Sequence, residues 1–370
     1  MRVKLEDVCE RASSNLKQSD IIDKNGDYPI YGASGYIGSV DFYHQDKPYV
    51  AVVKDGAGIG RTTLHPAYSS VIGTMQYLLP KDNVLPKYLY YVVKYMHLEK
   101  YFTGATIPHI YFKDYKYEEF NLDKIDRQRE IIDSLGKIEN VIEKRQQELD
   151  KLDELVKARF VELFGDPIIN PHNWELVNIS NVVSGKVSNG FFAKRDDYCD
   201  DGNIRVLGVA NVVNRMYSET ENLPRTNGSK KDIEKFAVKY GDMLFCRSSL
   251  VAEGIGKASI IPEYINDDVL FECHVIRLPL DLKKCVPEYI QVLSTTDFFR
   301  QQVISQSKTA TMTTIGQDGI LKTDIILPPL EKQKEFYIFV KQIDKSKVAV
   351  QKALDEAQLL FDSLMQEYFG

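Results

Sequence analysis

Long helical patterns begin at Arg127-Gln128-Arg129-Glu130 and at Lys332-Gln333-Lys334-Glu335, and these two stretches decide the fold. The patterns end at Glu162-Leu163-Phe164-Gly165 and at Glu367-Tyr368-Phe369-Gly370. The two starts and the two ends are both separated by 205 residues. A constant shift across both ends of a helix indicates that the chain contains a duplicated unit.

The repeat extends into the segments that precede the helices. The same shift pairs Thr106 with Thr311, Ile110 with Ile315, and Leu122 with Leu327. Loop insertions then change the shift, yet two further matches remain: Pro86-Lys87-Tyr88-Leu89 with Pro287-Glu288-Tyr289-Ile290, and Gly58-Ile59-Gly60-Arg61 with Gly254-Ile255-Gly256-Lys257. Each half is therefore expected to be a globular domain followed by one long helix.

The globular segments combine short β-rich runs with short helical patterns. Tyr49-Val50-Ala51-Val52-Val53 and Asp324-Ile325-Ile326-Leu327 are typical of strands, whereas residues 87–101 and 288–305 favour helices. The expected fold class is α+β, with two mixed α/β domains. The expected boundaries are 1–125 and 165–330 for the domains, and 126–164 and 331–370 for the long helices.

Apolar residues recur in each long helix at alternating steps of four and three. The first series is Ile131, Leu135, Ile138, Ile142, Leu149, Leu152, Val156 and Leu163, interrupted at Arg145 and Arg159. The second is Phe336, Val340, Ile343, Val350, Leu354, Ala357, Phe361, Leu364 and Tyr368, interrupted at Lys347. This spacing with charged flanks predicts a two-helix coiled coil. A helix packed on a globular core is the alternative.

The order of the segments favours an antiparallel pair. Roughly 38 residues make a helix about 57 Å long, and the second domain begins at its far end. A parallel pair would require that domain to carry the chain all the way back. Antiparallel helices need no such return and predict an approximate two-fold axis, a symmetry that a DNA duplex shares.

Composition narrows the class of protein. The formal net charge of −6 argues against a simple non-specific nucleic-acid binder. The five cysteines are scattered and form no Cys-x-x-Cys pair, which is typical of reduced thiols in a cytoplasmic protein. The chain has no run of eighteen apolar residues, so no membrane span is expected.

This organisation resembles the specificity subunit of type I restriction–modification systems over essentially the whole chain. The most specific pieces are Leu327-Pro328-Pro329-Leu330-Glu331-Lys332-Gln333 and the looser Leu122-Asp123-Lys124-Ile125-Asp126-Arg127-Gln128. Supporting pieces are Gly241-Asp242-Met243-Leu244, Arg247-Ser248-Ser249 and Gly254-Ile255-Gly256-Lys257-Ala258. The first half departs from the pattern, with Val53-Lys54-Asp55-Gly56-Ala57-Gly58 in place of the Arg-Ser segment and no Pro-Pro before its helix.

The resemblance implies two target-recognition domains that read a split, asymmetric sequence in double-stranded DNA. It also implies two methyltransferase subunits as partners, with two restriction/translocase subunits added in complexes that cleave DNA. Two other functions stay open: a coiled-coil scaffold for other proteins, and a self-contained enzyme. Nucleic-acid methylation would require a glycine-rich cofactor loop and an Asn/Asp-Pro-Pro-aromatic element, and an ATP motor would require a P-loop; the sequence has none of these. No catalytic residue, metal or cofactor is therefore expected.

Candidate DNA contacts are chosen by side-chain chemistry. Arg247 could present its guanidinium to guanine O6 and N7, with hydroxyls nearby for phosphate oxygens. The hydroxyl-rich stretch from residue 308 to 314 matches residues 103–109 of the first half. The full set is Lys54, Arg61, Asn189, Lys194, Arg195, Arg247, Ser248, Ser249, Lys257, Lys308, Thr309 and Thr311. An ordinary solvated surface residue is the alternative for each.

A second set of apolar residues, outside these two apolar series, also repeats between the two long helices. The pairs are Ile132 with Tyr337, Leu155 with Leu360, Phe160 with Met365, and Phe164 with Phe369. Two copies of one exposed patch would bind two copies of one partner. The alternative is that these residues attach each helix end to the neighbouring domain.

Overall fold

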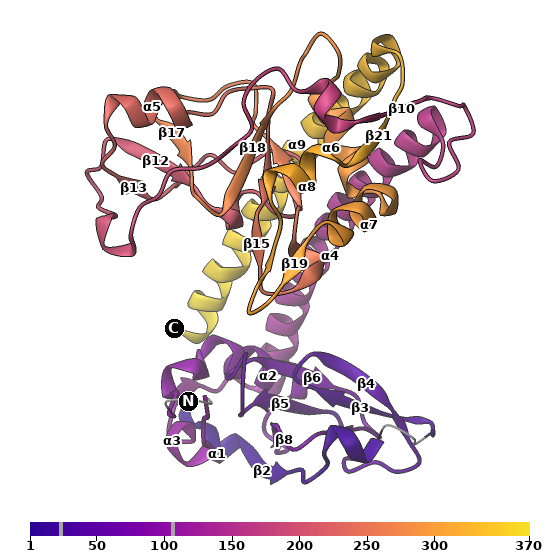
Figure 1. Cartoon of the computed structure of the whole chain (residues 1–370). Coiled ribbons are helices and arrows are strands. Elements are labelled where there is room, and N and C mark those ends of the chain that lie inside the picture. Colours follow the sequence, from indigo (N-terminus) through magenta and orange to yellow (C-terminus); the bar gives the residue numbers. More distant parts are fainter. Residues whose placement is uncertain (22–24, 105–107) are drawn as a thin grey trace. The chain divides into compact units, whose positions relative to one another are not determined.

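The computed structural model describes residues 1–21, 25–104 and 108–370, so Thr106 lies outside the described residues. The chain divides into two compact units, which are described separately. Unit 1 consists of Met1–Glu148 and Val350–Gly370, and unit 2 of Leu149–Ala349. The long helices α4 (Ile125–Phe164) and α9 (Leu330–Phe369) each contribute one part to each unit (Figure 1).

Unit 1 is built on an antiparallel four-stranded sheet in the order β2-β8-β5-β6. These strands are β2 (Cys9–Ser13), β8 (Met75–Pro80), β5 (Tyr49–Val53) and β6 (Thr62–His65). A second sheet, β4-β3-β7, contains β4 (Gly35–Val40), β3 (Tyr28–Gly32) and β7 (Ser70–Val71). Unit 1 also contains a separate two-stranded ribbon of β1 (Arg2–Lys4) and β9 (Glu119–Asn121). Its helices are α1 (Leu5–Val8), α2 (Pro86–Tyr95) and α3 (Phe112–Tyr115).

Unit 2 repeats this topology. Its four-stranded sheet has the order β11-β18-β14-β16: Ser188–Asn189, Val275–Pro279, Asp242–Cys246 and Ala258–Ile260. Its second sheet, β13-β12-β17, contains Arg225–Thr226, Ile204–Leu207 and Val269–Phe271. The ribbon is β10 (Glu175–Asn178) with β21 (Asp324–Leu327), and the helices are α5 (Lys230–Phe236), α6 (Pro287–Thr295), α7 (Asp297–Ser305) and α8 (Gln317–Leu321). The α+β class is therefore confirmed in two β-rich domains.

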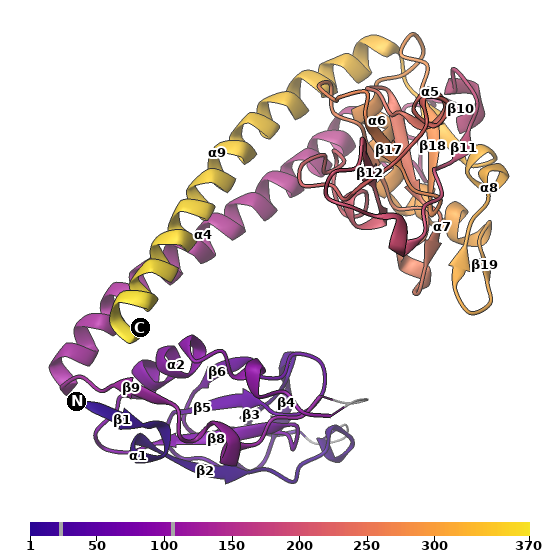
Figure 2. The same cartoon turned by 90° about the vertical axis from the view of Figure 1, so that its left-hand side faces the viewer.

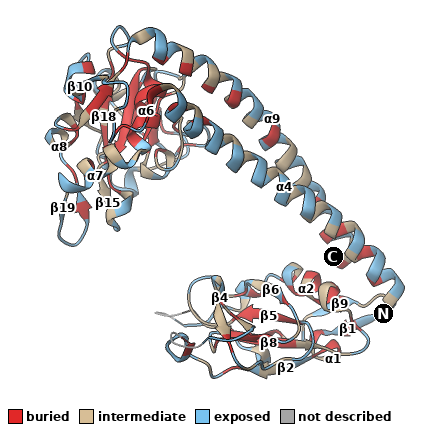
Figure 3. Ribbon diagram, turned by 90° about the vertical axis from the view of Figure 1, so that its right-hand side faces the viewer, coloured by how far each residue is buried: buried red, intermediate tan, exposed pale blue. Residues whose placement is uncertain are grey.

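The three-stranded sheets also agree in strand direction. In unit 1, β3 pairs antiparallel with β4 and parallel with β7. In unit 2, β12 pairs antiparallel with β13 and parallel with β17. The duplication thus includes upstream segments in which no repeat could be recognised by residue identity. Strands β5 and β8 of unit 1, and strands β14 and β18 of unit 2, are mostly buried in the cores, as is helix α6 (Figure 3).

The long helices pack antiparallel, as their order predicted. In unit 1, Ile131 and Leu135 of α4 share a core with Phe361 of α9. In unit 2, Val156 of α4 shares a core with Val340 of α9. The start of each helix thus lies beside the end of the other, and within each unit the two helices run side by side (Figure 2).

Two of the charged residues that interrupt the apolar series, Arg159 and Lys347, form ion pairs between the helices. The Arg159 guanidinium lies 2.9 Å from a carboxylate oxygen of Glu335, and Lys347 pairs with Asp153. Both pairs belong to unit 2. Charged residues that interrupt a coiled-coil seam lower its stability but fix its register, so these pairs favour one alignment of the helices.

A buried glutamine attaches the start of each long helix to a short helix. Gln333 Oε1 accepts a hydrogen bond from the backbone N–H of Val286, and its Nε2 donates to the carbonyl of Pro328. Gln128 Oε1 accepts from Leu85 N–H in the same way. Val286 and Leu85 are the residues that immediately precede α6 and α2, so each glutamine satisfies a backbone donor at the start of a helix.

We expect Gln333→Leu to destabilise the chain by about 1–3 kcal/mol for each buried group left without a partner, because Val286 N–H and the Pro328 carbonyl cannot reach water. Gln342→Leu is the matched control, since Gln342 lies exposed on the same helix and should change stability by less than about 0.5 kcal/mol. Urea unfolding of both variants measures the difference. Equal midpoints would show that the glutamine contributes nothing specific.

Within the described residues, no helix combines the length and apolar character that crossing a membrane requires. All five cysteines are free thiols.

Candidate nucleic-acid interface

A small three-stranded sheet brings together several residues that the sequence suggested separately. Its order is β15-β20-β19, with β15 (Ser248–Ser249), β20 (Thr313–Thr314) and β19 (Lys308–Thr309). Ser248 and Lys308 both lie opposite Thr314. Thr311 is exposed in the turn between β19 and β20. Hydroxyl groups and one ammonium therefore share a single sheet in unit 2.

Arg247 immediately precedes β15, and three hydrogen bonds fix its position. Its Nη1 donates to the carbonyl of Cys273 at 3.1 Å, and its backbone N–H donates to the carbonyl of His274. Its own carbonyl accepts from Ile315 N–H. Arg247, Lys308 and Lys322 line one hollow of about 480 Å³, in which Asp318 is the acidic member. The half-buried guanidinium is thus pre-positioned beside two cations.

The thiols and the serine hydroxyl beside Arg247 are not activated as nucleophiles. Burial raises the pKa of the Cys246 and Cys273 thiols, which keeps them protonated and poorly nucleophilic. Ser248 Oγ lies 3.4 Å from His274 Nδ1, which is longer than a well-formed hydrogen bond. Groups of acidic, histidine and cysteine side chains that could hold a metal ion are absent from residues 1–21, 25–104 and 108–370.

Asn189 lies beside the start of helix α8. It belongs to β11, and its Oδ1 is 3.3 Å from the side-chain amide of Gln317, the first residue of α8. Helix α8 follows β20 almost directly along the chain. Asn189 also lines a hollow with Lys186, Lys235 and Arg277.

The remaining candidates of unit 2 lie elsewhere. Lys194 and Arg195 are exposed at a 3-10 turn (Arg195–Asp197) beside β13, since the next residue, Tyr198, forms a bridge with Thr226. Lys257 donates to the Asn214 side chain at 2.7 Å. It lines a separate hollow, to which helix α4 also contributes side chains. Lys194, Arg195 and Lys257 therefore do not line the hollow that Arg247 lines.

Unit 1 contains the counterpart of the Arg247 site. Ile110 N–H donates to the carbonyl of Lys54, as Ile315 N–H does to that of Arg247. Asp55 forms a bridge with His109, as Ser248 does with Thr314. Lys54 therefore stands structurally where Arg247 stands in unit 2, a correspondence that residue types alone left uncertain.

The side chains of the unit 1 site are different, although the backbone arrangement is the same. His109 Nδ1 lies 2.7 Å from Asp55 Oδ1, and Lys54 Nζ lies 3.2 Å from the other carboxylate oxygen. Thr103 forms an antiparallel β-bridge with His109. Arg61 is exposed, and its Nη1 donates to the Ala33 carbonyl. The sequence did not single out Asp55 and His109; the shift of 205, which pairs His109 with Thr314, was the signal that could have found His109.

The candidate partner-binding residues fall into two groups. Phe160, Phe164, Met365 and Phe369 are at most 6% exposed and belong to the cores of their own units. Their burial corresponds to the alternative in which they attach helix ends to the domains, because a buried side chain offers no surface to a partner. By contrast, Leu155 is 46% and Leu360 52% exposed, and Ile132 and Tyr337 are half-buried.

The buried aromatic residues make equivalent contacts in the two units. The Phe164 ring lies 4.7 Å from Tyr289 of α6, and the Phe369 ring lies 5.4 Å from Tyr88 of α2. The hydroxyl of Tyr289 donates to the carbonyl of Ile326, and that of Tyr88 donates to the carbonyl of Asn121. Each long helix thus ends on the domain of the other half of the chain.

Comparison with known proteins agrees with this organisation. The model of the type I restriction modification DNA specificity domain matches residues 1–154 and 171–357. The specificity subunit of type I restriction enzyme MjaVIII of Methanocaldococcus jannaschii is 23% identical over 328 residues, which cover 82% of this chain and 76% of that protein. The MjaIX subunit of the same organism is 21% identical over 311 residues, with coverages of 78% and 69%. The crystal structure of a type I S subunit from M. genitalium has a similar fold, with a TM-score of 0.54 and 12% identity over 100% of this chain and 96% of that one.

Proposed function

The chain belongs to the type I restriction–modification specificity subunits, and we propose that its two domains each read one half of a split, asymmetric DNA sequence. Membership of the family implies recognition of a DNA target. We assign the halves of the target to residues 1–125 and 165–330. The observation that carries this proposal is the repeated site: one backbone arrangement presents Lys54, Asp55 and His109 in unit 1, but Arg247, Ser248 and Thr314 in unit 2.

The side chains at equivalent positions of the two domains differ, so each domain would recognise different bases. The target is asymmetric for this reason. A carboxylate such as that of Asp55 can accept from cytosine N4, whereas arginine matches O6 and N7 of guanine. Hydroxyls and ammonium groups on the β15-β20-β19 sheet suit phosphate oxygens, which position the protein without reading sequence. Lys308, Thr309 and Thr311 have this positioning role in the proposal. We assign further contacts with the DNA backbone to Asn189, Lys194, Arg195, Lys257 and Arg61.

The chain is proposed to direct partner enzymes rather than to act on DNA itself. Leu155 and Leu360, related by the shift of 205, would each bind one copy of a methyltransferase subunit. Complexes that cleave DNA would add restriction/translocase subunits. The purified chain alone should therefore neither methylate nor cleave DNA.

Arg247→Ala tests the reading of bases. We expect it to relax specificity at one base position by about 1–3 kcal/mol, because a bidentate guanine contact is lost. Competition binding against duplexes substituted one base pair at a time, in the complex with the methyltransferase, measures the loss. An unchanged preference at every position would show that Arg247 is structural.

Arg247→Lys is the matched control. Lysine keeps the charge but cannot form the planar two-point contact, so discrimination should fall while affinity for unrelated duplexes stays close to that of the native chain. If both variants instead weaken all duplexes equally, Arg247 contacts a phosphate and does not read a base.

A further inference from the structure

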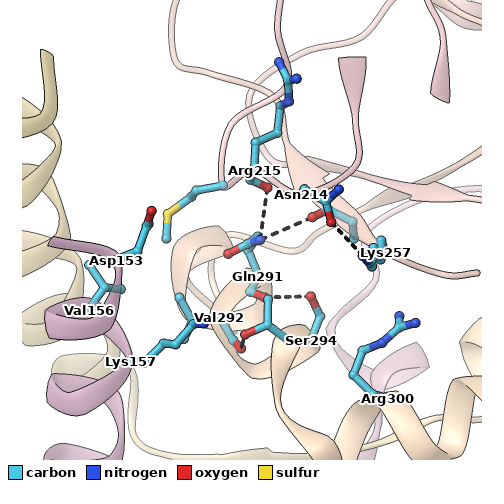
Figure 4. A pocket seen from close by; sticks show the side chains of 13 residues that line it. Asp153, Val156, Lys157, Asn214, Arg215, Lys257, Gln291, Val292, Ser294 and Arg300 are labelled. Carbon is cyan, nitrogen blue, oxygen red and sulfur yellow. Dashed lines mark hydrogen bonds between the residues drawn. The ribbon is translucent and has the colours of Figure 1, made fainter. Parts of the chain in front are cut away.

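Unit 2 contains a hollow of about 380 Å³, and Lys257 is the one residue lining it that the proposed function uses (Figure 4). Helix α4 contributes Asp153 and Lys157 on one side, and Lys257 and Arg300 lie on the opposite side. Helix α6 lies between them and contributes Ser294. All of these residues belong to unit 2.

Two backbone carbonyls hold the Arg300 guanidinium beside this hollow. Its Nη2 donates to the carbonyls of Ile255 at 2.6 Å and Glu253 at 3.1 Å. Its Nη1 is buried and has no hydrogen-bond partner among the described residues. Burial also lowers the pKa of this guanidinium, since a charge with little access to water is destabilised. The two carbonyl contacts therefore fix the position of this charge beside the hollow.

The charges around the hollow are predominantly positive. Within residues 1–21, 25–104 and 108–370, no carboxylate oxygen lies within 4.0 Å of the charged nitrogens of Lys157, Lys257 or Arg300. Asp153 is paired with Lys347. Arg215 also lines the hollow, but its guanidinium points away and lies 3.0 Å from Glu219. Three cationic side chains therefore lack a carboxylate that would neutralise them.

We propose that this hollow binds a phosphate group. One guanidinium and two ammonium groups, placed on opposite sides of the hollow, match the charge and the several oxygens of a phosphate. The phosphate belongs either to a small free molecule or to the backbone of bound DNA. The site adds to the function proposed above and does not depend on the reading of bases.

Calorimetric titration of the full chain with inorganic phosphate, at constant ionic strength in chloride, tests the site. Native protein should bind, and Lys157→Met and Lys257→Met should each weaken binding at least about tenfold, because each removes a charged donor. Lys151→Met is the matched control on α4, since Lys151 is exposed and does not line the hollow. Arg300→Lys keeps the charge and a donor to the carbonyls of residues 253 and 255, so it tests whether the guanidinium itself is required.

A second titration distinguishes the two sources of phosphate. If phosphate displaces a duplex of unrelated sequence from the native chain but not from Lys157→Met, the occupant is a DNA backbone phosphate. If phosphate binds equally well to the chain saturated with DNA, the occupant is a free molecule. No binding above the chloride background, or equal affinity in Lys151→Met, Lys157→Met and Lys257→Met, would overturn the proposal.

Discussion

Exchanging residues 1–125 for the corresponding domain of another specificity subunit will change one half of the recognised DNA sequence and leave the other half unchanged. Unit 1 has its own sheets and its own core, in which Val50 and Leu78 are fully buried. The proposed base contacts of unit 2 come from residues that the exchange does not touch. Each mismatched base pair costs about 1–3 kcal/mol, so three altered pairs amount to roughly 3–9 kcal/mol of discrimination.

The exchange must preserve the contacts that bind the domain to the long helices. Gln128 should be retained, and the donor domain should supply a tyrosine at the position of Tyr88, whose ring packs on Phe369. Sequencing of modified bases in cells that express the hybrid with its methyltransferase identifies both half-sites. A change in both half-sites would show that the domains do not read DNA independently.

A double substitution, Leu155→Asp with Leu360→Asp, should abolish binding of both methyltransferase copies, and each single substitution should remove one. Both side chains are about half exposed and occupy equivalent repeat positions on α4 and α9. A buried, unpaired carboxylate at the centre of an interface costs at least about 2 kcal/mol, which is about thirtyfold in affinity. Native mass spectrometry of the assembled complex counts the copies.

Val348→Asp is the control for this experiment. Val348 is 71% exposed on α9, but Glu143 occupies its repeat position, so it cannot belong to a duplicated patch. It should leave two copies bound. If the double variant keeps its helical circular-dichroism signal and still binds two copies, Leu155 and Leu360 are not the docking residues.

The helix pair could be predicted from sequence because its signals are local and long. Forty residues with regular apolar spacing identify a helix, and a constant shift of 205 identifies its duplicate. The order of segments then sufficed to predict antiparallel packing, which the cores shared by Ile131 with Phe361 and by Val156 with Val340 confirm.

The site was harder to predict because its strands are very short and pair over long distances. Strands such as β15 and β20 have two residues each, too few to show any alternation. Asp55 meets His109 only through the tertiary fold, so neither residue stood out alone. Spacing likewise could not distinguish an exposed patch from a buried one: Phe164 and Leu155 repeat equally well, yet one is fully buried and the other is not.

The most direct test of the central claim is sequencing of methylated bases across the genome of cells that express this chain with its methyltransferase. We predict one modified motif consisting of two different specific half-sites separated by a spacer of fixed length and unspecified sequence. Cells with the methyltransferase alone should lack that motif. A continuous or palindromic motif, or a modification pattern that does not change when the chain is withdrawn, would contradict the account.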